Sequence, residues 1–162
     1  MKVASYDIVF QEIPGEVTLA LNLSGCPCHC PGCHSPHLWE DTGEPLDEAL
    51  LDGLMARYEG LVTCVAFMGG DADPLSVLHL AEHARECTMN NSQCTIKTAW
   101  YSGRPASPET YGASLEAFDY VKFGPYVEAL GGLKSETTNQ RLYKRVGEGW
   151  EDITSAFWKK TL

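Results

Sequence analysis

The sequence lacks a long hydrophobic run. No segment approaches the roughly 18 consecutive apolar residues that a membrane-spanning helix needs, and no early stretch joins a basic start to an apolar segment of signal-peptide length. We therefore expect a cytoplasmic protein that does not bind a membrane.

Basic residues are also scarce. The chain has 12 Lys and Arg against 22 Asp and Glu, which gives a formal net charge of −10. Such a charge opposes attraction to a phosphate backbone, so nucleic acid is not an expected partner. Fixed-period repeats and low-complexity tracts are absent too. At 162 residues, we expect a single domain over 1–162.

Cysteine, in contrast, is plentiful. Seven cysteines are present, and four of them fall with three histidines in the segment 24–39, "SGCPCHCPGCHSPHLW", which we call the cysteine loop. An odd total, with four of the cysteines so close together, suits a metal site in a reducing compartment better than a disulfide framework.

The spacing within the cysteine loop allows two kinds of metal site. Cys26, Cys30 and Cys33 form Cys-x3-Cys-x2-Cys, with Cys28 as an extra thiol. Three thiolates can anchor a four-iron cluster and leave one iron open to an exogenous ligand. A zinc site fits the same spacing, and spacing alone does not decide between them. The zinc ligands would come from the four cysteines together with His29, His34 and His37.

Strand-like and helix-like runs alternate along the chain, which predicts an α/β fold. The first run, 17–23, alternates apolar with small or polar residues, as a strand with one buried face does. Asn90 and Asn91 mark a turn, and 124–162 is an irregular tail with a hairpin across Gly147 and Gly149. The predicted strands are 17–23, 62–68, 95–101 and 120–123; the predicted helices are 46–58, a helix opening at Pro74, and a short helix over 108–117.

A Gly69-Gly70-Asp71 segment follows the second predicted strand. Ligands of open α/β sheets bind at this end of the strands. Two glycines can bring unpaired backbone N–H and C=O groups against a ligand, and Asp71 can accept hydrogen bonds from a cationic one. An ordinary strand-to-helix turn, with Asp73 as the cap and Pro74 as the first residue, explains the same pattern.

Two lysines lie in predicted strands. An unpaired ammonium group is costly to bury, so Lys97 and Lys122 each face solvent or meet an anion. Lys97 is expected at a solvated strand edge. For Lys122, a solvated edge and a contact with an anionic ligand are equally expected. The remaining thiols are expected in the core or on the surface: Cys64, Cys87 and Cys94. The strand aromatics are expected in the core: Trp100, Tyr101, Tyr120 and Phe123.

The cysteine loop resembles that of radical S-adenosylmethionine (SAM) enzymes, and most closely that of the activating proteins of anaerobic ribonucleotide reductases. Their pattern is matched by Ser24-Gly25-Cys26, by Cys30-Pro31-Gly32-Cys33 and by Trp39. Similar segments follow the family order along nearly the whole chain: Asp7-Ile8-Val9, Pro14-Gly15, Gly69-Gly70-Asp71, Tyr101-Ser102-Gly103 and Asn139-Gln140-Arg141.

The resemblance implies a [4Fe-4S] cluster on Cys26, Cys30 and Cys33, with SAM on the fourth iron and Cys28 as a bystander. It implies that no side chain serves as a catalytic acid or base, because the cofactors carry the chemistry. Seven residues are expected at SAM: Gly32, Cys33, His34, Gly69, Gly70, Asp71 and Lys122.

The resemblance further implies an incomplete, open βα barrel of four to five units and an activase function. An electron from a flavodoxin or ferredoxin would cleave SAM into methionine and a 5′-deoxyadenosyl radical, which would take hydrogen from a glycine of anaerobic ribonucleoside-triphosphate reductase. An activase of another glycyl-radical enzyme and a non-catalytic zinc protein are the alternatives.

Three departures from the family pattern affect the expected site. Two extra residues separate Gly-Gly-Asp from Pro-Leu, so either Asp71 or Asp73 is the functional acid. Glu16 replaces an arginine of many relatives, and Ser35 replaces an asparagine. We expect both of these residues near the cluster.

Overall fold

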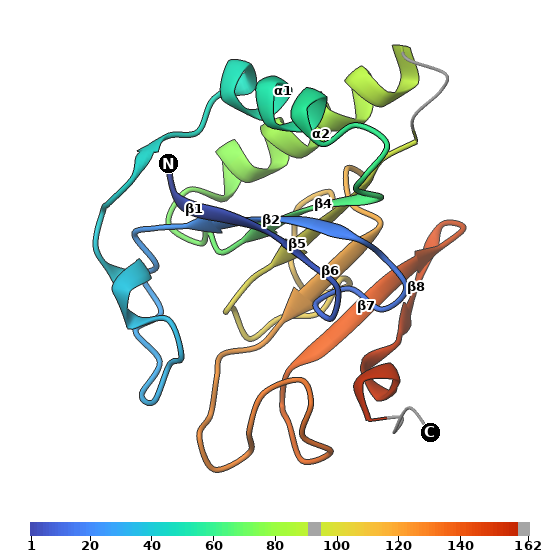
Figure 1. The fold of residues 1–162 in the computed structure, drawn as a ribbon. Coiled ribbons are helices and arrows are strands. Elements are labelled where there is room, and N and C mark those ends of the chain that lie inside the picture. The colour runs from blue at the N-terminus through green and yellow to red at the C-terminus, as the bar shows by residue number, and fades with distance from the viewer. Residues whose placement is uncertain (91–94, 159–162) are drawn as a thin grey trace.

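The computed structural model describes residues 1–90 and 95–158. Within them, one eight-stranded mixed sheet is joined by two α-helices (Figure 1). The strand order is β3-β1-β2-β4-β5-β6-β7-β8. The strands are β1 (Lys2–Val9), β2 (Thr18–Leu23), β3 (Glu44–Pro45), β4 (Cys64–Met68), β5 (Lys97–Tyr101), β6 (Tyr120–Phe123), β7 (Arg141–Val146) and β8 (Gly149–Asp152).

The centre of the sheet is parallel. β2, β4, β5 and β6 are consecutive parallel neighbours, and each lies within one of the predicted strands. Their residues are almost all buried, as in strands covered on both faces, so the single buried face predicted for 17–23 is wrong. β1 and β3 flank this centre on one side and β7 and β8 on the other, in antiparallel pairing.

Both helices lie on the same face of the sheet (Figure 1). α1 (Glu48–Arg57) is capped by Asp47, whose carboxylate accepts a hydrogen bond from the Leu50 N–H at 2.9 Å. α2 (Pro74–Asn90) begins after Asp73, as predicted. The larger core cluster lies between these helices and the sheet and includes Leu51, Leu54, Val77, Leu80, Ala84, Phe67, Trp100 and Phe123.

A smaller apolar cluster lies on the other face. It contains Cys64, Ala66, Ala99, Tyr120 and Leu142 from the strands, together with Ile13. Trp100, Phe123 and Tyr120 are 2% exposed or less, which confirms the prediction that these aromatics belong to the core.

The short helix predicted over 108–117 is wrong. The segment forms turns in which the Ser107 N–H donates to the Thr110 hydroxyl oxygen at 2.8 Å and Gly112 has a φ of +80°. Side-chain hydrogen bonds of this kind compete with helix formation. Leu115 and Ala117 of this segment still belong to the larger core cluster, so the segment is anchored by burial without forming a helix.

The N-terminal strand β1 had no clear sequence signal. Its polar residues Ser5 and Asp7 both accept hydrogen bonds from Asn22 of β2, at 3.0 and 3.3 Å, so polar pairing replaces apolar alternation there. The predicted closing hairpin is confirmed, since β7 and β8 pair across Gly147 and Glu148. Asn91 of the predicted turn lies outside the described residues, whereas Asn90 ends α2.

Glu16 is not near the cysteine loop, contrary to expectation. It lies before β2, at the opposite edge of the sheet, where its carboxylate pairs with Lys97 and accepts hydrogen bonds from Thr63 at 2.7 Å and Tyr120 at 2.8 Å. Burial raises the pKa of Glu16, but these donors outweigh it and leave the pKa below its usual range. Lys97 is therefore the ion-pair partner of Glu16, while its side chain stays 43% exposed to solvent.

The strand order is compatible with the expected open βα barrel, which stays a prediction. Two of the three crossovers between parallel neighbours contain a helix, α1 between β2 and β4 and α2 between β4 and β5. The third crossover, between β5 and β6, is built of turns.

Gly70 provides a test of the packing between β4 and α2. A Cβ on Gly70 would lie 2.4 Å from Val77 Cγ2, and the Gly70 φ is +86°. We expect Gly70→Ala to lower the free energy of unfolding by about 2–4 kcal/mol, through overpacking and backbone strain.

Gly53→Ala is the control, because Gly53 lies within α1 and a Cβ added there would meet nothing within 4 Å. It should raise stability by about 0.5–1 kcal/mol. Urea unfolding measures both, and equal midpoints for Gly70→Ala and the unmodified protein would contradict this packing.

Candidate functional site

The four parallel strands end at one edge of the sheet. β2 leads into the cysteine loop, β4 into Gly69-Gly70-Asp71, β5 into Ser102-Gly103 and β6 into Gly124. Because these strands are parallel neighbours, segments that are far apart in the sequence meet here. Most of the predicted site residues lie in these segments.

The base of the cysteine loop is closed by hydrogen bonds. The Cys26 N–H donates to the Leu38 carbonyl at 3.0 Å, and the Ser24 hydroxyl donates to the Thr42 carbonyl at 2.6 Å. Inside the loop, the His29 and Trp39 rings stack with centroids 4.8 Å apart. The Ser35 N–H lies 3.4 Å from Cys33 Sγ, so Ser35 is near the predicted cluster, as expected.

The loop cysteines are not arranged around a single ion. Cys26, Cys28, Cys30 and Cys33 are partly buried free thiols. In the described residues, one group of three or more potential ligands has all its ligand atoms within 4.8 Å of one another, and it does not include these cysteines. A zinc ion with Zn–S bonds of about 2.3 Å needs sulfurs about 3.8 Å apart. A cubane takes each thiolate on a different iron, so it does not need three sulfurs this close together.

Cys28 faces the end of β4. Its Sγ lies 3.7 Å from Asp71 Oδ2, and a Cβ on Gly103 would come within 2.9 Å of the same sulfur. Burial, together with the charge of Asp71 and the neighbouring thiols, raises the pKa of Cys28 to about 12. Iron is bound by thiolates, so this contact favours a ligand set without Cys28.

The structure separates the two candidate acids. Asp71 is 3% exposed, and its carboxylate accepts hydrogen bonds from the Ser102 hydroxyl at 2.5 Å and the Gly103 N–H at 2.8 Å. Asp73 instead caps α2 by accepting hydrogen bonds from Ser76, which hold its pKa below the usual range. Asp71 is therefore the acid beside the cysteine loop.

Lys122 places a buried cation at the same edge. It is 7% exposed, and its ammonium group donates to the carbonyls of Gly124 at 2.7 Å and Ser102 at 3.3 Å. Burial lowers the pKa of Lys122 to about 8, although Asp71 and the loop thiols raise it. An ammonium group has three N–H donors, and the two carbonyls leave one for an anionic ligand.

The glycine pair differs from expectation at its first residue. The Gly69 N–H donates to the Tyr101 carbonyl at 2.9 Å, and the Gly69 carbonyl accepts from Trp100 Nε1 at 2.8 Å. Both backbone groups of Gly69 are thus engaged within the protein and are not presented to a ligand.

The segment after β6 covers part of the cysteine loop, a feature without a sequence signal. A Cβ on Gly32 would lie 3.2 Å from the Glu128 carboxyl group, and the His34 ring is 5.0 Å from that of Tyr126. Figure 1 shows the loop and this segment extending from the same part of the molecule. Gly32 and His34 therefore have protein partners beside any cofactor contact.

The cysteine loop offers ligands for a metal centre, and comparison with known proteins identifies the class of this centre. Residues 14–143 match a family model described as a 4Fe-4S single cluster domain. The match covers most of the chain, so the protein belongs to this family and carries a [4Fe-4S] cluster. Neither the curated proteins nor the solved structures gave a match. No helix in the described part of the chain is long and apolar enough to cross a membrane.

The cysteine loop gives a direct test of the ligand set. We expect Cys26→Ala, Cys30→Ala and Cys33→Ala each to abolish most of the bound iron and sulfide, because each removes one corner of a cluster with three protein ligands. Cys28→Ala should retain the cluster, since its sulfur faces Asp71. Iron and sulfide analysis of anaerobically purified protein measures this loss. An equal loss in Cys28→Ala would show that the predicted ligand set, which leaves out Cys28, is wrong.

Proposed function

We propose that the protein is a radical SAM activase that installs a glycyl radical on anaerobic ribonucleoside-triphosphate reductase. The observation that carries the proposal is the set of three cysteines, Cys26, Cys30 and Cys33, in one loop that follows the first parallel strand. Three thiolates leave one iron of a [4Fe-4S] cluster for another ligand. The segment similarities along the chain support SAM as that ligand.

The described residues fit the binding of SAM. When bound, the reduced cluster would supply the electron that cleaves SAM into methionine and a 5′-deoxyadenosyl radical. Lys122 offers one N–H donor and a positive charge to the SAM carboxylate. Asp71 fixes the ends of β4 and β5 through Ser102 and Gly103.

These residues act by position and not by proton transfer. A radical takes hydrogen from the nearest C–H bond, so the protein has to orient its substrates and exclude water. The cover from the segment after β6 suits this need, and its Val127 and Leu130 are partly exposed apolar residues on which a protein substrate could pack.

The activity can be measured directly. We expect the dithionite-reduced protein to convert SAM to methionine and 5′-deoxyadenosine, and to produce a glycyl-radical doublet by electron paramagnetic resonance when the reductase is present. Cys33→Ala should give neither signal, and Cys28→Ala should give both.

The other outcomes separate the alternatives. A doublet obtained only with a different glycyl-radical enzyme would change the partner. A cluster that is reduced but never cleaves SAM would indicate electron transfer alone. Colourless protein with one zinc ion in the cysteine loop would overturn the proposal.

Lys122 tests the expected SAM contact. Hydrogen bonds to charged groups contribute about 1.5–3 kcal/mol, so Lys122→Met should weaken SAM binding about 10- to 100-fold while the cluster remains. Lys97→Met is the matched control, because Lys97 lies in the neighbouring strand but pairs with Glu16 at the opposite edge. Equilibrium binding to the oxidised cluster-loaded protein measures both, and an unchanged affinity in Lys122→Met would remove Lys122 from the SAM site.

A further inference from the structure

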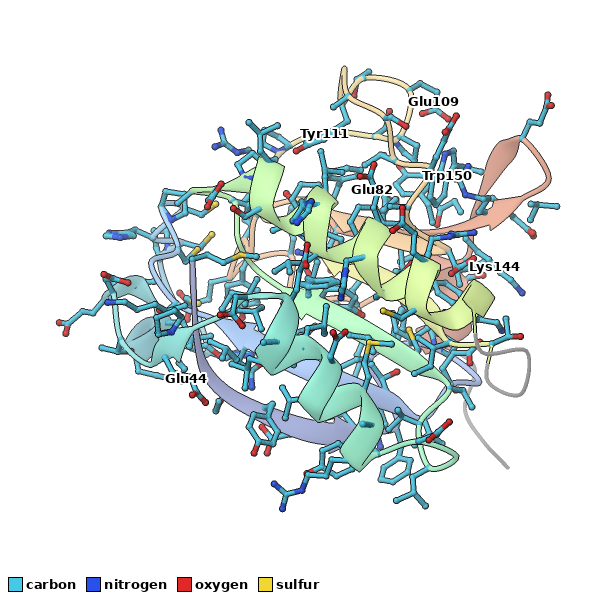
Figure 2. All side chains as sticks on the ribbon, turned by 90° about the horizontal axis from the view of Figure 1, so that it is seen from above. Glu44, Glu82, Glu109, Tyr111, Lys144 and Trp150 are labelled. Atoms are coloured by element: carbon cyan, nitrogen blue, oxygen red, sulfur yellow. The ribbon has the colours of Figure 1, made fainter. Side chains whose placement is uncertain are left out.

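A second group of metal-ligating side chains lies between the two helices, far from the cysteine loop. α1 and α2 run side by side over the sheet (Figure 2). α1 contributes Glu48 and Asp52, four residues apart, and α2 contributes His79, His83 and Cys87 at the same spacing. Residues four apart share one face of a helix, so all five side chains meet along the line between the helices.

Three of these side chains converge on one point. Cys87 Sγ lies 3.6 Å from both His83 Nε2 and Asp52 Oδ1, and His83 Nε2 lies 2.8 Å from Asp52 Oδ1. In the described residues, this is the group whose ligand atoms all lie within 4.8 Å of one another.

We propose that Asp52, His83 and Cys87 form a mononuclear zinc site that joins α1 to α2. Tetrahedral zinc with bonds of about 2.3 Å to sulfur and 2.0–2.1 Å to nitrogen or oxygen places sulfur about 3.6 Å from its neighbours. The two sulfur distances already have this value. The distance between His83 Nε2 and Asp52 Oδ1 needs to increase by only about 0.6 Å to reach tetrahedral geometry.

The ligand types select zinc among common divalent ions. Thiolate and imidazole suit zinc, whereas calcium and magnesium prefer oxygen ligands. Burial and the nearby carboxylates of Asp52, Glu86 and Glu48 raise the pKa of Cys87, so the metal has to displace the thiol proton. Asp52 is about half exposed, with 48% of its side-chain surface accessible, so a water molecule can reach the fourth position.

Glu48 supports the site from outside. Its carboxylate lies 3.7 Å from His83 Nδ1 and 2.7 Å from His79 Nε2. The 3.7 Å distance is longer than a hydrogen bond, so Glu48 acts on the ring as a nearby negative charge. A slightly closer approach would let it accept the Nδ1–H of His83, as carboxylates do beside ligating histidines. His79 is a positioning residue for Glu48 and not a ligand.

The zinc site is independent of the proposed radical chemistry. Cys87 is 13 residues after Pro74, which places it about 20 Å along α2 from the edge where the cysteine loop lies. Zinc has no redox chemistry, so we assign it a structural role in holding the two helices together.

The test uses anaerobic protein with its cluster loaded, so that the loop thiols are occupied. We expect one additional Zn²⁺ per chain in competition with a chromophoric chelator. Cys87→Ser and His83→Ala should weaken this binding at least about 100-fold, and Glu48→Gln about 10- to 100-fold. Glu82→Gln, on α2 but outside the site (Figure 2), should bind zinc normally. Normal zinc binding by Cys87→Ser would overturn the site.

A second measurement needs no variant. Saturating Zn²⁺ should slow alkylation of Cys87 by iodoacetamide at least about tenfold, as read by fragment-resolved mass spectrometry, and Cys28 in the same sample serves as the internal reference. An unchanged alkylation rate at Cys87 would refute the proposal. SAM cleavage should be the same with and without zinc, so this result is separate from the proposed function.

Discussion

The parallel alignment of β2, β4, β5 and β6 is the constraint on which the site depends. Parallel neighbours direct their following loops to one edge, so a loop that begins at Ser24 meets segments that begin at Gly69, Ser102 and Gly124. Hydrogen bonds then fix this edge. Asp71 joins the end of β4 to Ser102 and Gly103, and Trp100 binds the Gly69 carbonyl.

The ligand edge of the sheet holds a buried cation although the whole chain is strongly acidic. The protein carries a formal net charge of −10, yet a buried lysine lies beside the loop thiols. A cluster held by three thiolates concentrates negative charge, and an ammonium group in a region of low dielectric stabilises that charge strongly. The carbonyls of Ser102 and Gly124 hold Lys122 in place, so its charge needs no rearrangement when an anionic ligand arrives.

The helix-covered face of the sheet and its ligand edge are separate parts of the structure. α1 and α2 cover one face and supply most of the core through Leu51, Leu54, Val77 and Leu80. The proposed zinc site would strengthen the contact between these helices without touching the ligand edge. The cluster and the proposed radical chemistry would then depend on the loops at the ligand edge and not on the zinc site.

Local patterns in the sequence predicted the central elements well. The alternation in 17–23, the glycine pair after 62–68 and the cap at Asp73 depend on neighbours in the chain, and the structure has β2, β4 and α2 at those places. The cysteine spacing likewise indicated a cluster or zinc before any fold was known. Over 108–117 the local pattern misled, because the segment forms turns although Leu115 and Ala117 are buried in the core.

The tertiary structure alone decided which distant residues meet. The chain order does not reveal that Asp71 accepts hydrogen bonds from Ser102 and Gly103 while Asp73 does not. The ion pair of Glu16 with Lys97 spans 81 positions, and the group of Asp52, His83 and Cys87 spans two helices. Local patterns determine helices and strands because turns, caps and the alternation of apolar residues depend on residues close together in the sequence. The packing of the sheet and helices determines which distant residues form a site.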